Sequence, residues 1–177
     1  MTRKNTKEII KTYFLDNPTA KLRVREIERT VHTSLPSTIR FCKDLEQEHI
    51  LTIIKIGTVK FYTANKMSPQ YLLEKRLHNI KQIYNSGLID YLNQEFSNPV
   101  LILFGSFAKG EDIEESDIDI YLETPSKKKI NIEKFEKQLK KQIQLFQQKE
   151  IREIKNKNLV NNILNGITIN KQIEVFK

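Results

Sequence analysis

The sequence has a single cysteine, Cys42, and three scattered histidines, His32, His49 and His78. One cysteine excludes an internal disulfide framework, and the histidine spacing fits no metal-binding motif. No apolar run approaches the ~20 residues that cross a bilayer. The first five residues lack the apolar core of a signal peptide, and internal repeats and low-complexity linkers are absent from the sequence. We therefore expect a cytoplasmic protein without a membrane partner.

The chain of 177 residues, with 38% hydrophobic and 29% charged residues, is typical of a soluble globular protein of one or two domains. Its net charge of +8 is unevenly distributed. Residues 1–66 carry thirteen Lys/Arg against seven Asp/Glu, residues 67–126 four against ten, and residues 127–177 thirteen against five. Basic regions on both sides of an acidic one favour a polyanionic partner, and solvated lysine-rich faces without any partner are the alternative.

The most informative pattern lies between residues 100 and 122. An apolar run ends in Gly105-Ser106, and ten residues later Asp117-Ile-Asp119 begins a stretch in which polar and apolar side chains alternate. This alternation predicts a half-buried strand with Asp117, Asp119 and Tyr121 on one face and three aliphatic side chains on the other. The two carboxylates then point to the same side, where they can bind one divalent cation.

The residues around this strand suggest a site for phosphate. Gly105 permits a sharp turn and lets a backbone N–H approach a ligand closely. We expect Ser106 to cap the following turn or helix, whose N–H groups would bind phosphate, and Lys109 to add positive charge. The alternative is a Gly-Ser turn before a solvated acidic loop and an ordinary edge strand. With Ser116 just before the two aspartates, we favour a site that moves a phosphoryl or nucleotidyl group.

Gly105-Ser106, ten further residues and Asp117-x-Asp119 resemble the signature of the DNA polymerase β-like nucleotidyltransferase superfamily, in particular its minimal nucleotidyltransferase branch. The resemblance covers roughly residues 98–176. It implies an α/β (α+β) domain with a mixed sheet and flanking helices, in which Asp117 and Asp119 are catalytic and bind Mg²⁺. It also implies that Gly105 and Ser106 hold the triphosphate of ATP or another NTP. From the local sequence we add Lys109 and Ser116 to the expected nucleotide contacts.

The implied reaction is transfer of a nucleotidyl group, AMP from ATP, to a protein or other hydroxyl acceptor. In similar small enzymes the acceptor is often a tyrosine of a partner toxin from a neighbouring gene, which would make this chain an antitoxin. The sequence departs from the family where a third carboxylate is usual, since the next predicted strand, residues 142–148, offers Gln144 or Ile143 there. Glu150, just beyond this strand, is an alternative source of the carboxylate.

This departure leaves the chain's activity open. A nucleotidyltransferase is the reading that we favour. The rival is a DNA-binding transcriptional regulator whose nucleotidyltransferase domain binds nucleotide without turning it over. A third alternative is an interaction module that contacts no nucleotide.

The first third of the chain predicts helices over residues 6–16, 24–31 and 36–48, followed by strands over residues 50–56 and 58–63. This order resembles the winged helix-turn-helix family. The third helix, with Ile39, Cys42 and Leu45 facing inward, would be the recognition helix for duplex DNA. Dimerisation or protein docking is the alternative. The expected DNA contacts come from the recognition helix and the wing: Ser37, Thr38, Arg40, Lys43, Lys55 and Lys60.

We expect three parts: a winged helix-turn-helix domain (1–66), a helical connector (67–97) and a nucleotidyltransferase domain (98–177). The connector's first helix, residues 68–84, carries an apolar stripe that forms either core or the seam of a homodimer. Residues 127–129 are a lysine loop that either approaches a polyphosphate or is solvated. Near the end we predict a helix that stops at Gly166 and two strands, residues 167–169 and 173–176.

Overall fold

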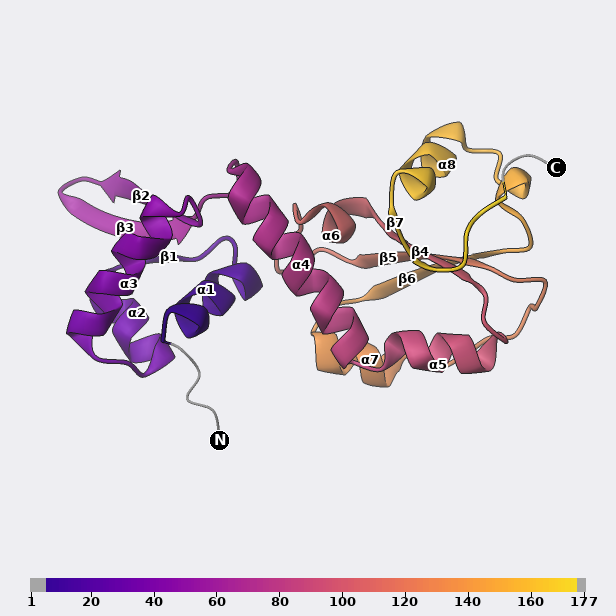
Figure 1. Ribbon diagram of the computed structural model, residues 1–177, viewed down its shortest axis with the longest axis horizontal. Helices are drawn as coiled ribbons and strands as arrows, with labels where there is room; N and C mark the ends of the chain where they lie inside the picture. The colour runs from indigo at the N-terminus through magenta and orange to yellow at the C-terminus, as the bar shows by residue number, and fades with distance from the viewer. Residues whose placement is uncertain (1–5, 175–177) are drawn as a thin grey trace. The chain divides into compact units, whose positions relative to one another are not determined.

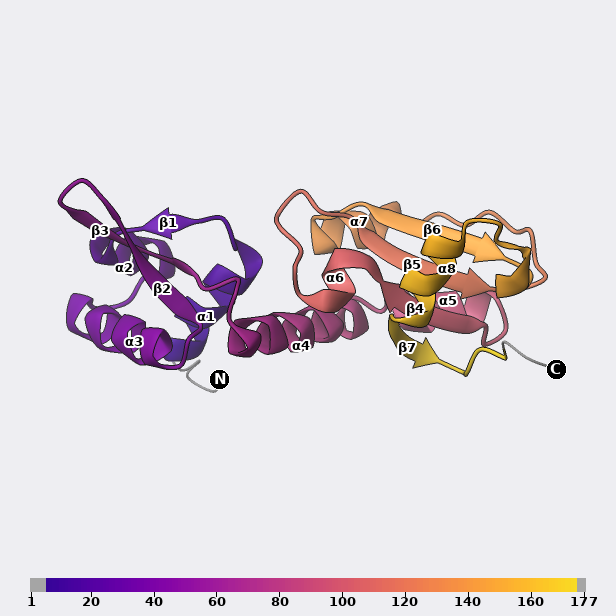
Figure 2. The same ribbon diagram turned by 90° about the horizontal axis from the view of Figure 1, so that it is seen from above.

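The computed structural model describes residues 6–174 and divides into two compact units, Met1–Lys75 and Arg76–Lys177. Each unit has its own sheet (Figures 1 and 2) and is described by itself. Among the described residues, no helix has both the length and the hydrophobicity needed to cross a bilayer. The domain boundaries that we expect after residues 66 and 97 stay predictions.

The amino-terminal unit contains three helices and a small antiparallel sheet with the strand order β1-β3-β2. The helices and the hairpin follow the order predicted from the sequence. The two-residue strand β1 was missed, because two residues show no periodicity. The elements are α1 (Thr6–Asp16), β1 (Lys21–Leu22), α2 (Val24–Val31), α3 (Leu35–Gln47), β2 (Leu51–Ile56) and β3 (Val59–Ala64).

The inward face of α3 differs from the prediction by one position. Thr38, Cys42 and Leu45 are fully buried, whereas Ile39 is 39% exposed. The hydroxyl of Thr38 donates to the carbonyl of Ser34 at 3.0 Å, so its burial leaves no unpaired polar group. Burial also raises the pKa of the Cys42 thiol to about 12, which fits a core residue and not a reactive one.

The carboxy-terminal unit is built on a four-stranded mixed sheet with the order β6-β5-β4-β7, which Figure 2 shows from above. Strands β5 and β6 are parallel, and β4 is antiparallel to both β5 and β7. This is the mixed sheet with flanking helices that the sequence predicts. The elements are α4 (Pro69–Asn85, which begins in the amino-terminal unit), α5 (Leu88–Glu95), β4 (Val100–Phe104), α6 (Gly105–Lys109), β5 (Ile118–Glu123), α7 (Glu133–Leu139), β6 (Ile143–Gln148), η1 (Ile151–Glu153), α8 (Lys157–Leu164) and β7 (Ile167–Asn170).

Both faces of this sheet are covered, with α5 and α7 on one side and α8 on the other (Figure 1). Ile118, Ile120 and Leu122 of β5 pack on the first side, as the alternation predicts. The expectation that β5 is only half-buried is wrong, however, because Tyr121 is fully buried beneath η1 and α8. On this face of β5, partly exposed polar side chains lie only at the two ends of the strand: the two aspartates at its start and Glu123 at its end.

Two further expectations need correction. The apolar stripe of α4 is not core, since Leu73, Leu77 and Tyr84 are 46%, 55% and 50% exposed. The predicted strand over 173–176 does not begin as expected, because residues 173 and 174 are coil, and the rest of it lies outside the described residues. The helix that stops at Gly166 and the strand after it are confirmed as α8 and β7.

Candidate active site

The two aspartates and Gly105 meet at one edge of the mixed sheet. In the strand register Asp119 lies opposite Phe104 of β4 on one side and opposite Gln144 of β6 on the other. Gly105 follows Phe104 with φ +76°, a left-handed conformation that favours glycine. A Cβ at Gly105 would lie 2.2 Å from Oδ2 of Asp119, so the carboxylate occupies the space that any other side chain would need.

The carboxylates of Asp117 and Asp119 repel one another, and this repulsion favours binding of a cation at this edge of the sheet. Burial raises the pKa of Asp119, and the negative charge of Asp117 raises it further. The two carboxylates therefore disfavour one another in the absence of a cation. A divalent metal between them would remove this repulsion.

Gln144 lies where the sequence analysis places the missing third carboxylate. Its Nε2 donates a hydrogen bond of 2.5 Å to Oδ2 of Asp117, while Ile143 points into the core and is only 7% exposed. Glu150 cannot replace it. Because β6 runs parallel to β5, Glu150 lies beyond the far end of β6, at least about 13 Å from Gln144 by strand rise.

The other predicted phosphate ligands fit less closely. Ser106 does not cap a helix, because Phe104 is the N-cap of α6 and Ser106 lies in its first turn. The hydroxyl of Ser116 accepts a hydrogen bond from the N–H of Ile113 at 3.0 Å and so closes a turn. Lys109 is exposed in the last turn of α6 and makes no hydrogen bond or ion pair within the described residues.

A buried polar network fixes the loop between α6 and the aspartates. Asp112, only 1% exposed, accepts a 2.6 Å hydrogen bond at Oδ1 from Nδ2 of Asn79, and the same nitrogen donates to the Phe107 carbonyl at 2.8 Å. Lys141 lies 3.4 Å from Oδ2 of Asp112. Its ammonium also donates to the carbonyls of Ile113 at 2.5 Å, Glu114 at 3.2 Å and Ser116 at 3.3 Å.

This network holds the segment that leads into Asp117 and Asp119, so it helps to keep their two negative charges close together. The ammonium of Lys141 is held by three loop carbonyls and a buried carboxylate, so the end of the loop is fixed directly before Asp117. The sequence analysis missed all three side chains of the network. Asn79 and Lys141 are 62 residues apart, and no pattern within one segment relates them.

Comparison with protein families agrees with this geometry. Residues 86–169 match the family described as "Nucleotidyltransferase domain". This part of the chain is similar to that family. The match spans the sheet, α6 and the aspartate edge, and it does not include the amino-terminal unit. Searches of the curated proteins and of the solved structures found no match.

Nucleotidyltransferase domains typically use Mg²⁺ and a nucleoside triphosphate. The described residues contain no group of three or more His, Cys, Asp or Glu side chains that could enclose a metal. Mg²⁺ does not need such a cage, since it is usually bound by one or two carboxylates together with substrate phosphates and water. The donor set of Asp117 and Asp119 fits this mode. The amide oxygen of Gln144 would be a neutral third ligand if the amide turned over.

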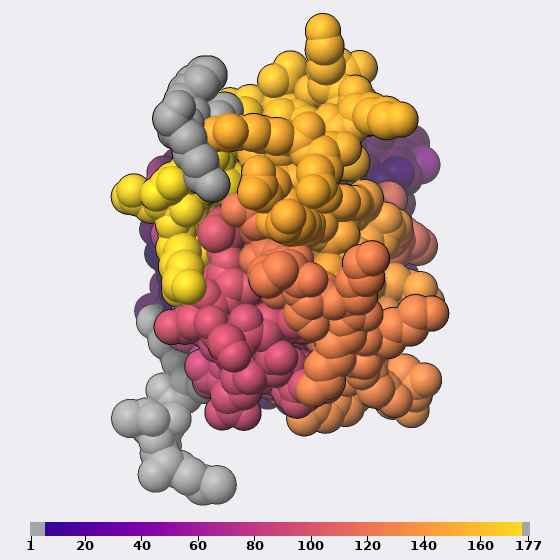
Figure 3. Space-filling model, turned by 90° about the vertical axis from the view of Figure 1, so that its right-hand side faces the viewer, coloured from indigo at the N-terminus to yellow at the C-terminus, as the bar shows by residue number. Residues whose placement is uncertain are grey.

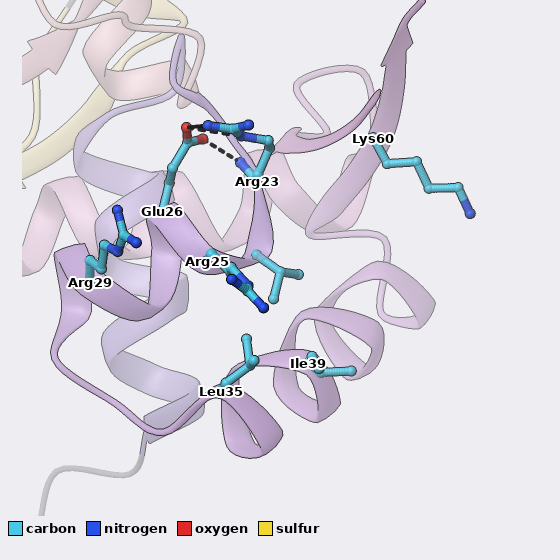
Figure 4. A pocket seen from close by; sticks show the side chains of 8 residues that line it. Arg23, Arg25, Glu26, Arg29, Leu35, Ile39 and Lys60 are labelled. Carbon is cyan, nitrogen blue, oxygen red and sulfur yellow. Dashed lines mark hydrogen bonds and ion pairs between the residues drawn. The ribbon is translucent and has the colours of Figure 1, made fainter. Parts of the chain in front are cut away.

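The amino-terminal unit has a separate basic cavity of about 570 Å³, shown in Figure 4. Val24 of α2 and Leu35 and Ile39 of α3 form its apolar wall. Four cationic side chains surround it: Arg23, Arg25, Arg29 and Lys60. Arg23 is paired with Glu26 at 2.5 Å, whereas the other three make no hydrogen bond or ion pair in the part of the chain that the structure describes.

This cavity changes the set of candidate nucleic-acid contacts. Thr38 is buried, so the predicted contact through its side chain is wrong. Ser37 accepts a hydrogen bond from Ser34, and the guanidinium of Arg40 lies 4.4 Å from the centre of the Phe41 ring. Lys43, Lys55 and Lys60 are exposed. The analysis missed Arg25 and Arg29, although their i, i+4 spacing on a helix marks a common face.

Proposed function

We propose that the nucleotidyltransferase domain transfers AMP from ATP to a hydroxyl acceptor. The observation that carries this proposal is the carboxylate of Asp119, which lies against Gly105 at the end of β4 with Asp117 on the same edge. The family match supports the reaction class. The raised pKa of Asp119 supports a role in holding a cation.

In the proposed reaction the acceptor oxygen attacks the α-phosphorus of ATP. An oxygen–phosphorus bond forms, the bond from the α-phosphorus to the bridging oxygen breaks, and pyrophosphate leaves. The hydroxyl proton passes to a carboxylate of the aspartate pair. Asp117 and Asp119 would hold Mg²⁺, which offsets the charge of the triphosphate. Gly105, Ser106 and the exposed Lys109 would orient the phosphates at the start of α6.

The acceptor in this proposal is a hydroxyl group on a protein encoded by a neighbouring gene. If that protein is a toxin, the modification would make this chain its antitoxin. The test incubates the two proteins with Mg²⁺ and ATP labelled either at the α- or at the γ-phosphorus. Transfer of the α-label alone, lost in Asp117→Asn/Asp119→Asn, is the expected result. Transfer of the γ-label would indicate a kinase and would refute the proposal.

The rival function is a regulator that binds nucleotide without turning it over. The amide of Gln144 in contact with Asp117 supports it, because an amide supplies neither charge nor a general base. Calorimetry separates the two. A regulator would bind ATP with Mg²⁺ and lose this binding in Asp117→Asn/Asp119→Asn, yet the wild type would transfer no label to any acceptor.

A second candidate function, duplex DNA binding by the amino-terminal unit, is supported by the basic cavity around α2. Arg25, Arg29 and Lys60 are unpaired within the described residues and could contact phosphates, so affinity should fall steeply with salt. Each lost contact should lower the slope of log affinity against log salt by about 0.9. A gel-shift titration compares three proteins: wild type, Arg25→Ala/Arg29→Ala/Lys60→Ala, and Arg40→Ala/Lys43→Ala.

The two variants distinguish the surfaces. A larger loss in the Arg25 variant places the DNA at the cavity, and a larger loss in the Arg40 variant places it on the exposed face of α3. No shift of the wild type at low salt would exclude duplex DNA and leave protein docking as the role of this unit.

A further inference from the structure

The carboxy-terminal unit has a second polar cavity, of about 500 Å³, at the end of the sheet opposite to the aspartates. The segment that follows β5 and the end of β6 line it together, and both leave the sheet at the same edge because the two strands are parallel. Figure 3 faces this end of the unit. Its charged side chains are Lys127, Lys129, Lys149 and Glu153.

Hydrogen bonds fix the cavity's backbone. The N–H of Thr124 donates to the carbonyl of Gln148 at 2.8 Å, and Nε2 of Gln147 donates to the carbonyl of Ser126 at 2.5 Å. The N–H of Ser126 donates to the hydroxyl of the buried Thr124 at 3.3 Å. The segment after β5 is therefore attached to the end of β6, and the lysines project from a defined frame.

The three residues of the lysine loop do not share one role. Lys128 forms an ion pair with Glu95 of α5 and does not line the cavity. Lys127 and Lys129, on either side of it, line the cavity. Together with Lys149 they make no hydrogen bond or ion pair among the described residues. The wall therefore carries three cationic side chains against one carboxylate, that of Glu153.

The composition of the wall indicates what could bind. Ammonium groups bind phosphate as point charges, and three of them around one cavity suit linked phosphates. The wall contains no aromatic side chain that could stack on a base. Thr124 lies five residues along β5 from Asp119, about 17 Å by strand rise, so a triphosphate at the aspartates would not reach the cavity.

We propose that this cavity is a second anion site, which binds an oligophosphate through its phosphates alone and without a metal. The oligophosphate could be inorganic or part of a nucleotide, because both offer the same chemistry to the lysines. The site is independent of nucleotidyl transfer and could be present whether or not the domain is catalytic.

The test is calorimetry of the full chain at low salt with EDTA, using inorganic triphosphate as the probe. Asp117→Asn/Asp119→Asn serves as the background that lacks the metal site. On this background, Lys127→Ala/Lys129→Ala/Lys149→Ala should weaken binding by about tenfold or more, equivalent to at least about 1.4 kcal/mol. Lys128→Ala is the matched control from the same loop and should bind as the background does. Thermal melting checks that each variant is folded.

Three outcomes would overturn the proposal. The first is that triphosphate at about 1 mM does not bind. A dissociation constant of about 1 mM corresponds to a binding free energy of only about 4 kcal/mol, so even a weak site would be detected. The second is a loss that occurs in Arg25→Ala/Arg29→Ala/Lys60→Ala and not in the lysine variant, which would place the anion in the amino-terminal unit. The third is ATP binding tenfold more tightly than triphosphate, since the base would then contribute. The proposal is supported if ATP and triphosphate bind with equal affinity and if the triple lysine variant loses the binding of both.

Discussion

The two ends of strand β5 differ in charge and in the way their loops are held. At the start of β5, Asp117 and Asp119 follow a loop that is held by the buried side chains of Asn79 and Asp112 and by the partly buried Lys141. After β5, the lysines project from a segment that hydrogen bonds attach to β6, and their ammonium groups are exposed. Like charges need structural support only where they are partly buried, because water screens exposed ones.

This contrast predicts that the two loops respond very differently to loss of a lysine. Lys141→Met should lower the free energy of unfolding by about 3–5 kcal/mol, because it removes a cation that lies 3.4 Å from the buried carboxylate of Asp112. The measurement is chemical denaturation at neutral pH. The control is Lys137→Met, whose ion pair with Glu133 is 4.0 Å long and exposed and should contribute at most about 1 kcal/mol. Equal losses in the two variants would mean that the network is not structural.

A second prediction separates backbone strain from the contact with Asp119. Gly105 and Gly87 have the same φ of +76°, but a Cβ at Gly87 meets no atom within 4 Å. Alanine at either position should cost about 1–2 kcal/mol for the left-handed conformation. Gly105→Ala should cost a further ~1–3 kcal/mol, because its Cβ would overlap the Asp119 carboxylate.

The double variant Gly105→Ala/Asp119→Ala tests the cause of this difference. Removal of the carboxylate should bring the cost of alanine at Gly105 close to its cost at Gly87, as measured in the same denaturation series. If the extra cost persists without Asp119, the contact inferred between Gly105 and the Asp119 carboxylate is wrong.

The sequence predicted the acidic end of β5 far better than the network that supports it. Gly105, Asp117 and Asp119 fall within fifteen residues, and strand periodicity alone places both carboxylates on one face. Alternation along β6 left Gln144 and Ile143 as alternatives for the third position, and the register opposite Asp119 selects Gln144. By contrast, Asn79 of α4 is 33 residues from Asp112 in sequence, and as a polar residue it does not belong to the apolar stripe that the sequence analysis considered.

The errors in the helices have the same origin. Thr38 is buried because its hydroxyl bonds to the Ser34 carbonyl within the helix, and this places Ile39 at the cavity wall. On α4, the buried Asn79 belongs to the inward face and the apolar stripe with Leu77 faces outward. Hydrophobicity thus predicted the wrong inward residue on α3, and on α4 it left open whether the stripe was core. In both helices a polar side chain with a hydrogen-bond partner is buried instead.

A third prediction adds a carboxylate to the acidic end. Gln144→Glu should tighten Mg²⁺ binding about tenfold, or by about 1.4 kcal/mol, because a third negative ligand would join Asp117 and Asp119. It should also raise the rate of AMP transfer if the missing carboxylate limits catalysis. Metal titration and the α-label assay measure the two effects. Gln148→Glu places the same charge at the far end of β6 and should leave Mg²⁺ binding unchanged. An equal gain in both variants would reflect overall charge and not the site.

The smallest expected effect concerns pH in the absence of metal. Burial and the charge of Asp117 raise the pKa of Asp119 above its ordinary value of 3.8. A carboxyl whose pKa is raised by folding stabilises the folded state only while it is protonated. The wild type should therefore match Asp119→Asn at low pH and become less stable than this variant as the pH rises above 3.8 through the raised pKa.

Unfolding measured from pH 3 to pH 8 with EDTA gives this difference directly. The control, Glu111→Gln, removes an exposed charge from the same loop and shows how much of the difference comes from net charge alone. Saturating Mg²⁺ should abolish the advantage of Asp119→Asn, because the cation offsets the repulsion that the substitution removes. A wild type that remains as stable as Asp119→Asn at pH 8 without metal would show that the two carboxylates do not oppose one another. The contrast between a supported acidic end and a freely charged basic end of β5 would then fail.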